Sequence, residues 1–283
     1  MKAMILAAGL GTRLRPYSEI LPKPLFPILE RPLILHLLEQ LRNQGFGPCL
    51  VNAHFLRGQL LSLLGQRPGV ELQLEDEVLG TGGGLRLALE RLAPGPVLVL
   101  NGDTLISCRL DDLRARHLAS GARISLAVHD QPRFNNLRVN REGTVTAFRV
   151  GAGHFEPEKG ERLLAYTGLQ FLDPSVLAGI PLGKFQDLID YYAVLVEAGE
   201  RINTLEVRDH YWADIGTPAD YLALHRDLLT GIVQPWPDFL SRPSAPVLLG
   251  EEVELGAGAK IEEWAMIGAG TRIGPGALVR PYL

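Results

Sequence analysis

Apolar segments and amphipathic segments alternate through the first half of the chain, and this alternation limits the fold more than any other feature. Ala3–Ala7 and Val97–Leu100 are typical of buried strands, whereas Pro32–Gln44 and Leu110–Ser120 have the apolar spacing of helices. Strands that alternate with helices form a mostly parallel sheet with helices on both faces. We therefore expect a three-layer α/β/α domain over residues 1–230, built on a mostly parallel mixed sheet.

The pattern changes in the second half of this region. Thr144–Val150 and Leu163–Leu172 read as strands joined by turns, which predicts an antiparallel insertion. Pro218–Leu229 is predicted to be the last helix, with Thr217 as its N-cap and Asp220 three residues later. That spacing is close to a capping box.

The end of the chain is a repeat that follows a proline-rich stretch. We interpret residues 231–246 as a linker, because four prolines interrupt it. Beyond it an aliphatic residue returns every six positions, at Leu249, Leu255, Ile261, Ile267, Ile273 and Val279. This period is typical of hexapeptide repeats and predicts a short left-handed parallel β-helix over residues 247–283. Because about two coils bury little of their own core, we expect the tail to pack on the first domain or to form a homo-oligomer.

Charge and composition exclude several classes of function. A net charge of −4 argues against a nucleic-acid-binding surface, which needs a basic excess. No apolar run approaches the ~18 residues of a membrane span. The apolar start passes directly into GTRLRP without a cleavage region, so it is not a signal peptide. We expect a cytoplasmic protein that binds neither nucleic acid nor membranes.

The loop after the first strand combines glycines with cations. Residues Leu6–Ile28 read LAAGLGTRLRPYSEILPKPLFPI. This loop lies at the carboxyl edge of the expected sheet, where α/β proteins bind ligands. Gly9, Gly11 and Thr12 can present backbone N–H groups to phosphate oxygens, since glycine allows close approach. The dinucleotide motif GxGxxG and the P-loop motif GxxxxGK[ST] are both absent.

Cations follow these glycines at short intervals. Arg13 and Arg15 can form charge-assisted hydrogen bonds with phosphate. Lys23 stands between two prolines on a stiffened segment, and a compact cation there suits the stabilisation of charge on a reacting phosphoryl group. The segment therefore indicates a phosphate-binding site and not a solvated loop.

These motifs together resemble the sugar-1-phosphate nucleotidylyltransferases. LAAGLGTRLRP and PKPLFPI are followed by EDEVLGTGGG, VLNGDT, YTGLQFLDP and YWADIGTPADYL, in the order of that family, within residues 1–230. The resemblance implies a Rossmann-like nucleotidyltransferase domain, which joins a nucleoside triphosphate to a sugar 1-phosphate with Mg²⁺ and releases pyrophosphate. Within this family, the motifs favour the mannose-1-phosphate guanylyltransferases. The alternatives are a uridylyltransferase acting on an amino-sugar 1-phosphate and a non-catalytic regulatory subunit of the same fold.

The resemblance also implies residue roles. The implied nucleotide-binding residues are Leu6, Ala8, Gly9, Gly11, Thr12, Arg13, Glu75, Gly80 and Thr81. The implied sugar-binding residues are Asn101, Gly102, Thr167 and Gly168. Many members carry a Glu-Lys-Pro segment that contacts the sugar phosphate; this chain lacks it, and Arg149 is the candidate replacement. Asp103 and Asp214 are the implied Mg²⁺ ligands. Arg13 would neutralise the leaving pyrophosphate, and Lys23 would bind the α-phosphate or the sugar phosphate.

Overall fold

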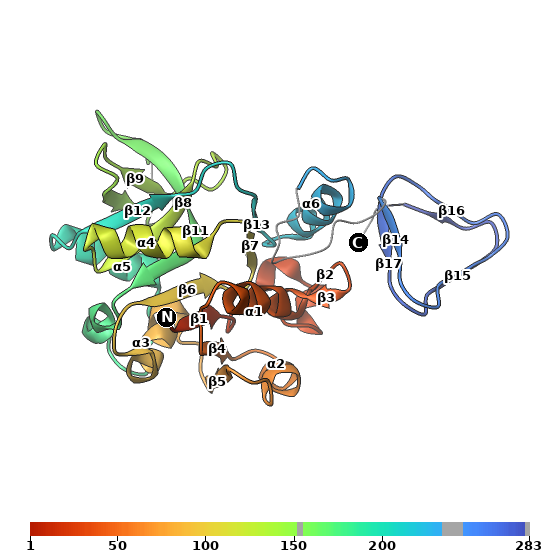
Figure 1. Cartoon of the computed structure of the whole chain (residues 1–283), viewed down its shortest axis with the longest axis horizontal. Helices are drawn as coiled ribbons and strands as arrows, with labels where there is room; N and C mark the ends of the chain where they lie inside the picture. Colours follow the sequence, from red (N-terminus) through yellow and green to blue (C-terminus); the bar gives the residue numbers. More distant parts are fainter. Residues whose placement is uncertain (152–154, 234–245, 281–283) are drawn as a thin grey trace.

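A nine-stranded mixed sheet forms the centre of the first 230 residues (Figure 1). The structure, a computed structural model, describes residues 1–151, 155–233 and 246–280. The strands of this sheet are β1 (Ala3–Leu6), β4 (Cys49–Ala53), β5 (Val70–Leu74), β6 (Val97–Asn101), β8 (Ile124–His129), β9 (Leu137–Val139), β10 (Val145–Phe148), β11 (Arg162–Leu172) and β12 (Ile202–Glu206).

Most strands of the sheet run in one direction. The strands β6, β1, β4 and β5 are parallel neighbours in that order, and β12 pairs in parallel with β8. The long strand β11 runs antiparallel to β6, β8 and β9, and β10 runs antiparallel to β9. The predicted mostly parallel mixed sheet is therefore confirmed, as is the antiparallel insertion.

Helices cover both faces of this sheet (Figure 1). They are α1 (Leu33–Asn43), α2 (Arg57–Leu64), α3 (Gly80–Leu92), α4 (Leu110–Ser120), α5 (Leu188–Glu197) and α6 (Pro218–Leu229). Alternate residues of β1 point to opposite faces, so Ala3 and Ile5 join the apolar cluster that includes α1 and α4, whereas Met4 joins that of α3 and α5. This arrangement confirms the three-layer architecture.

Two helices begin where the local sequence alone does not fix a start. The helix α3 begins at Gly80, although glycine is a poor helix former. The helix α5 begins at Leu188, because Asp187 caps it by accepting from the N–H groups of Ile189 and Asp190. The cap predicted for α6 is present: Thr217 Oγ1 accepts from Asp220 N.

A two-stranded ribbon projects beyond the carboxyl ends of the parallel strands. It pairs β7 (Thr104–Ile106) with β13 (Trp212–Asp214) in antiparallel fashion, so that Asp214 lies opposite Thr104. Segments more than a hundred residues apart in the sequence therefore meet at the sheet edge (Figure 1).

The tail forms short parallel strand pairs. They are β14 (Val247–Leu249) with β17 (Ala265–Ile267), β15 (Glu254–Leu255) with β18 (Arg272–Ile273), and β16 (Lys260–Ile261) with β19 (Leu278–Val279). In each pair the partner lies three hexapeptides further along the chain. The pairs agree with the six-residue period, but they alone do not confirm a left-handed β-helix.

The tail contacts the first 230 residues near a small hairpin, β2 (Pro27–Ile28) with β3 (Arg31–Pro32). Glu30, in the turn of that hairpin, accepts a hydrogen bond from Ala269 N at 2.8 Å. Most of the predicted linker, residues 234–245, lies outside the described residues, so the division into domains stays a prediction. In the part of the chain that is described, no helix is both long and apolar enough to cross a membrane.

Candidate active site

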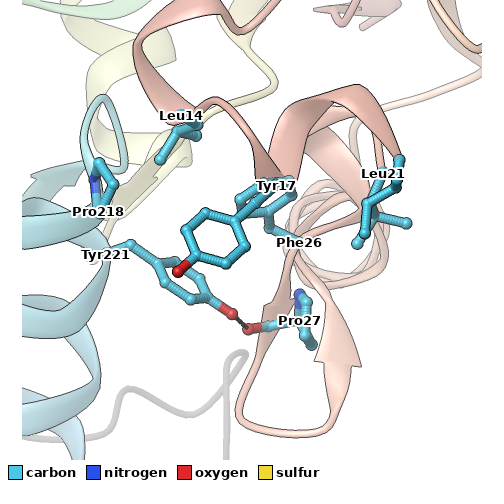
Figure 2. A pocket seen from close by; sticks show the side chains of 8 residues that line it. Leu14, Tyr17, Leu21, Phe26, Pro27, Pro218 and Tyr221 are labelled. Carbon is cyan, nitrogen blue, oxygen red and sulfur yellow. Dashed lines mark hydrogen bonds between the residues drawn. The ribbon is translucent and has the colours of Figure 1, made fainter. Parts of the chain in front are cut away.

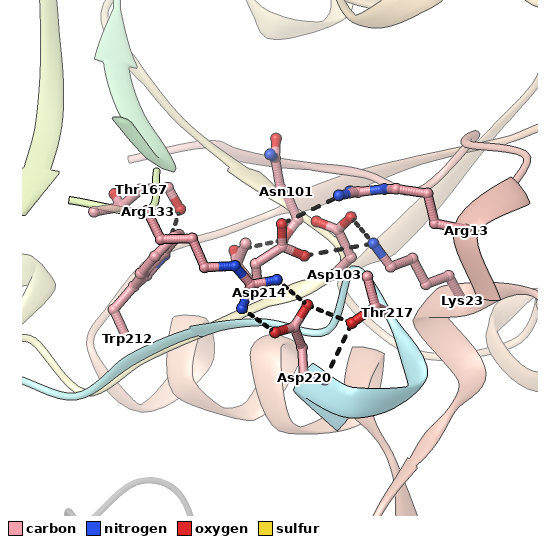
Figure 3. Close-up of polar contacts among 11 residues, drawn as sticks. Arg13, Lys23, Asn101, Asp103, Arg133, Thr167, Trp212, Asp214, Thr217 and Asp220 are labelled. Carbon is pink, nitrogen blue, oxygen red and sulfur yellow. Dashed lines mark hydrogen bonds and ion pairs between the residues drawn. The ribbon is translucent and has the colours of Figure 1, made fainter. Parts of the chain in front are cut away.

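A lysine and two aspartates meet at the carboxyl edge of the sheet (Figure 3). Lys23 Nζ donates to Asp103 Oδ2 at 2.5 Å and lies 3.5 Å from Asp214 Oδ1. Asp103 occupies the turn between β6 and β7, and Asp214 ends β13 on the adjacent strand. The β7–β13 ribbon therefore brings together two carboxylates that are far apart in the sequence.

Lys23 is the buried member of this cluster. Its side chain is only 10% exposed, and it begins the short 3₁₀ helix η3 (Lys23–Leu25) between the two prolines. A buried ammonium group is costly unless it is paired, and here both partners are carboxylates. The local geometry agrees with the stiff segment predicted from Pro22 and Pro24.

The surroundings of Asp214 disfavour its negative charge. Burial and the nearby charge of Asp103 raise the pKa of its carboxyl group, while Lys23 and Arg13 oppose this rise. Its Oδ1 is buried and accepts no hydrogen bond from the described residues. Two neighbouring carboxylates, whose only close cations are Lys23 and Arg13 among the described residues, fit the oxygen-rich ligation that Mg²⁺ prefers. No group of three or more candidate metal ligands occurs among the described residues, so substrate phosphates and water would have to complete the coordination.

The glycine loop lies beside this cluster. Gly11 has a positive φ of 63°, and a Cβ there would come within 3.1 Å of Ser18, so this position favours glycine. Nothing lies within 4 Å of a Cβ built on Gly9. Thr12 begins the 3₁₀ helix η1 (Thr12–Leu14) directly after Gly11. The loop thus turns sharply and leaves space above Gly9.

Arg13 extends from the glycine loop towards Asp214. Its Nη2 lies 3.9 Å from Asp214 Oδ2, and its side chain is 62% exposed. A Cβ on Gly216 would approach the guanidinium to 3.0 Å, so this glycine, two residues after Asp214, leaves room for the arginine. Arg15, by contrast, lies on the surface and pairs with Glu19 at 3.5 Å.

An apolar cavity of about 180 Å³ backs this loop (Figure 2). Leu14 and Pro218 contribute to its wall, next in sequence to Arg13 and Thr217. The Tyr221 hydroxyl, on α6, donates to Pro27 O across one side of the cavity. Packing between residues 14–27 and α6 thereby fixes the loop of Lys23 relative to the segment that carries Asp214.

A second cavity of about 190 Å³ lies on the glycine-loop side of the aspartates. It is lined by Leu6, Ala8, Gly9, Asn52, Glu75, Val78, Leu79, Gly80, Thr81, Asn101 and Asp103. Most of the residues predicted to bind the nucleotide are therefore gathered here. The Thr81 hydroxyl accepts from Leu188 N at 3.0 Å, which ties the start of α3 to α5.

Glu75 is held rigidly in this cavity. It is 2% exposed, and its Oε1 accepts from Asn52 Nδ2 at 2.8 Å and from Gln73 Nε2 at 3.0 Å. Asn52 Oδ1 in turn accepts from Ala7 N at 2.7 Å, on the loop after β1. Among the described residues nothing donates to Glu75 Oε2. Sequence analysis missed Asn52 and Gln73, which are paired polar residues on the neighbouring strands β4 and β5.

The three glycines after Thr81 make room for this network. A Cβ on Gly84 would lie 2.8 Å from Asn52 Nδ2 and 2.9 Å from Glu75 Oε1. A Cβ on Gly83 would lie 2.4 Å from Lys184 O. The glycines therefore let α3 pack closely against Glu75 and the segment before α5, which explains a helix that begins with poor helix formers.

The residues predicted to bind the sugar have different environments. Gly168 has a positive φ of 84°, and a Cβ there would meet Asn101 Nδ2 at 2.7 Å, so these two positions are in contact. Thr167 is buried; its hydroxyl donates to Ala127 O at 2.9 Å, and its carbonyl accepts from Trp212 Nε1. Gly102 N donates to Leu6 O, which joins the turn of Asp103 to β1.

Arg149 lies apart from the aspartates. It follows β10, is exposed, and places its guanidinium 5.4 Å from the centre of the Phe155 ring. The cavity that it lines also contains Phe148 and Glu197, and shares no residue with the cavity of Glu75. The structure therefore does not bring Arg149 to Lys23, Asp103 or Asp214.

Comparison with known proteins identifies the family of this chain. The family model described as nucleotidyl transferase matches residues 2–231. The chain belongs to the nucleotidyl transferase family. A probable mannose-1-phosphate guanylyltransferase 2 of Arabidopsis thaliana is 34% identical, over 97% of this chain and 75% of the relative. A UTP–glucose-1-phosphate uridylyltransferase of Synechocystis is 30% identical, over 99% of this chain and 81% of the relative.

Solved structures share the fold of this nucleotidyl transferase. A putative glucose-1-phosphate thymidylyltransferase from Bacillus anthracis superimposes with a TM-score of 0.70, at 19% identity, over 87% of this chain and 99% of the other. HddC from Yersinia pseudotuberculosis gives a TM-score of 0.66 at 24% identity, over 79% of this chain and 97% of the other. The family assignment made from the motifs, the sugar-1-phosphate nucleotidylyltransferases, is confirmed, and with it the class of enzyme.

Proposed function

We propose that this chain transfers a guanylyl group from GTP to mannose 1-phosphate, in a reaction that depends on Mg²⁺ and yields GDP-mannose and pyrophosphate. The observation that carries the choice of base is the carboxylate of Glu75. Mannose is proposed because the most similar relatives named above include a probable mannose-1-phosphate guanylyltransferase.

The hydrogen-bonding capacity of Glu75 favours guanine. Asn52 and Gln73 donate to Oε1, no described residue donates to Oε2, and Glu75 lines the cavity, so one carboxylate oxygen is left as an acceptor. An ionised carboxylate only accepts hydrogen bonds. Guanine offers two adjacent donors, N1–H and the N2 amino group, whereas uracil offers a single N3–H between two carbonyl oxygens. A fixed carboxylate therefore suits guanine better than uracil.

The reaction needs positioning and charge stabilisation, with no covalent enzyme intermediate. An oxygen of the sugar phosphate attacks the α-phosphorus of GTP in line, a new P–O bond forms, and the bond to the β-phosphate breaks as pyrophosphate leaves. The backbone of Gly9–Thr12 would hold the phosphates, and Arg13 would neutralise the pyrophosphate as it departs. Lys23, buried between the carboxylates, would contact the α-phosphate or the incoming sugar phosphate as charge develops.

Asp103 and Asp214 would hold the metal ion of this reaction. Both carboxylates face Lys23 Nζ, and Asp214 Oδ1, which is ion-paired with Lys23 but accepts no hydrogen bond from the described residues, would be a ligand. When bound there, Mg²⁺ would neutralise negative charge on the phosphates. Lys23 could then replace its carboxylate partner by a phosphate oxygen. The positive charge of Lys23 would therefore stay paired throughout the reaction.

A uridylyltransferase is the second candidate. The Synechocystis relative named above as a UTP–glucose-1-phosphate uridylyltransferase covers almost the whole chain at 30% identity. A regulatory subunit without activity is the third, and the clustering of Lys23 with both aspartates weighs against it.

A substrate screen tests the proposal. Pyrophosphate release would be measured for GTP, UTP, dTTP and CTP, each with mannose, glucose and N-acetylglucosamine 1-phosphates, and with Lys23→Ala as the inactive control. We expect the highest kcat/KM with GTP and mannose 1-phosphate. A maximum with UTP would support the uridylyltransferase instead, and no release with any pair would overturn the enzymatic function.

A further inference from the structure

Apart from Lys23, which the α-phosphate would share, the sugar phosphate lacks an obvious cation in this chain. The Glu-Lys-Pro segment is absent, and Arg149 lies in a cavity away from the aspartates. Lys23 and Arg13 both approach the aspartates from the glycine-loop side (Figure 3). A dianionic phosphate monoester that enters from the other side needs a positive partner of its own.

A cavity of about 310 Å³ adjoins Asp214 on that other side. Its polar and aromatic wall includes His129, Arg133, Phe134, Trp212, Asp214 and Asp220. His129 Nδ1 is buried there without a hydrogen-bond partner among the described residues. The cavity thus combines three aromatic side chains (Phe134, Tyr211 and Trp212) and two histidines with one arginine and three aspartates, one of which, Asp214, we assign to the metal.

Arg133 is held in this cavity by Asp220. Its Nη1 and Nη2 donate to the two oxygens of Asp220, the second at 3.1 Å, and its guanidinium lies 4.8 Å from the centre of the Phe134 ring. Asp220 is itself fixed, because it accepts from the Thr217 hydroxyl at 2.7 Å at the start of α6. A guanidinium has five N–H donors, so this pairing leaves others available, and the arginine side chain is 62% exposed.

The position of Arg133 matches the stereochemistry of the reaction. In-line displacement places the attacking oxygen and the leaving oxygen on opposite sides of the phosphorus. Figure 3 shows Arg13 and Lys23 on one side of the two aspartates and Arg133 on the other. If Arg13 neutralises the leaving pyrophosphate, Arg133 stands on the side from which the acceptor would arrive.

We propose that Arg133 binds the phosphate of the incoming sugar 1-phosphate, and that Asp220 is a positioning residue that holds its guanidinium in place. This inference rests on the proposed transfer to a sugar 1-phosphate, but not on which base is transferred. Arg133 supplies the cation that the missing Glu-Lys-Pro segment supplies in other members, from a different part of the chain.

The test replaces Arg133 by Gln and measures both Michaelis constants. We expect the KM for the sugar 1-phosphate to rise by about tenfold to a hundredfold, since a charge-assisted pair is lost, with the KM for the triphosphate unchanged. Arg133→Lys, which keeps the charge, should recover part of the loss. Asp220→Asn should raise the same KM by less, and should add little in the Arg133→Gln background.

Arg162 provides the matched control. It donates from both Nη atoms to the two oxygens of Glu206, between β11 and β12, in the same geometry as Arg133 and Asp220. Arg162→Gln should leave both KM values unchanged. An unaltered sugar-phosphate KM in Arg133→Gln would overturn the inference. An equal rise of both KM values would also overturn it, because the ion pair would then serve only to support the fold.

Calorimetry separates this inference from the proposed function. Mannose 1-phosphate and free mannose would be titrated into the wild type and into Arg133→Gln, without turnover. The wild type should bind the phosphorylated sugar more tightly, and Arg133→Gln should abolish that difference. A preference that survives in the variant would refute the role of Arg133, even if the substrate screen succeeds. If Arg133→Gln loses the preference but the wild type shows no turnover in the substrate screen, only the transferase function is refuted. If the wild type binds neither sugar, both the transferase function and the role of Arg133 are refuted.

Discussion

The two sides of the aspartate pair are built differently. On the glycine-loop side, where we propose that the nucleotide binds, Glu75 is buried. Asn52 and Gln73 fix it through hydrogen bonds of 2.8 and 3.0 Å. On the opposite side, where we propose that the acceptor sugar 1-phosphate binds, Arg133 is a long side chain that is 62% exposed and is anchored by one carboxylate, that of the mostly buried Asp220. A buried network allows little adjustment, whereas an exposed arginine can adapt. The comparison suggests that selectivity for the base is rigid and that selectivity for the sugar is more easily changed.

The largest effect on turnover is expected for Lys23, which lies between the two aspartates, where the two sides meet. Lys23→Ala should lower kcat by about a thousandfold, because it removes a pre-positioned cation from developing negative charge. The protein should remain folded, as judged by circular dichroism, since the two aspartates can be partly neutralised by Mg²⁺. Turnover within tenfold of the wild type would show that Lys23 stabilises charge on neither the nucleotide nor the sugar phosphate.

A substitution at Glu75 should affect only the nucleotide side. Glu75→Gln replaces an acceptor by a mixed donor and acceptor, so the KM for GTP should rise by about tenfold or more while the KM for the sugar 1-phosphate stays constant. The ratio of kcat/KM values for GTP and UTP is the direct readout. If that ratio does not fall, Glu75 does not read the base.

A smaller effect on the same side should come from the glycine that packs against the network. Gly84→Ala would force a Cβ to within 3 Å of Asn52 and Glu75, which should raise the KM for GTP severalfold and lower the free energy of unfolding by about 1–2 kcal/mol. Gly58→Ala, in α2 with open space around it, is the matched control and should stabilise the protein by about 0.5–1 kcal/mol. Equal outcomes for the two variants would contradict the tight packing.

The smallest effect is expected for the ion pair of Arg162 and Glu206, which serves as the control for Arg133 and Asp220. Hydrogen bonds from Arg162 are the main cause that lowers the pKa of Glu206 to about 2, from 4.5. A carboxyl group with a lowered folded-state pKa stabilises the fold above pH 4.5, and this contribution is lost as the pH falls towards 2. Because the pair is partly exposed, Arg162→Gln should cost less than about 1 kcal/mol at pH 6. Urea titrations should show the difference disappearing below pH 3; a constant difference would contradict it.

The parts of the fold that depend on local patterns could be predicted from the sequence. Leu110–Ser120 has the predicted bounds, because Leu110 and Leu113 mark its buried face and Gly121 ends it in the left-handed conformation. The cap of α6 at Thr217 follows from side-chain chemistry within one turn. The family motifs directed attention to Asp103 and Asp214, and the structure places both beside Lys23, but their roles stay predictions.

The parts that depend on tertiary contacts could not be predicted. The helix at Gly80 forms because close packing against Glu75 outweighs the low helix propensity of glycine. The support of Glu75 comes from Asn52 on another strand, for which the only signal was a polar residue in an apolar run. Arg133 belongs to no recognised motif, and its partner Asp220 lies 87 residues away. Such pairs become visible only once the strands are placed.

The account depends on a metal ion held by the two aspartates at the point where both sides meet. The most direct test is a titration with Mn²⁺, a spectroscopic substitute for Mg²⁺, followed by electron paramagnetic resonance in the presence of a non-reactive GTP analogue. Asp103→Asn and Asp214→Asn should each weaken Mn²⁺ binding by at least about tenfold, whereas Asp112→Asn, at an exposed position on α4, should not. If all three variants bind Mn²⁺ as tightly as the wild type, the metal lies elsewhere and the account is contradicted.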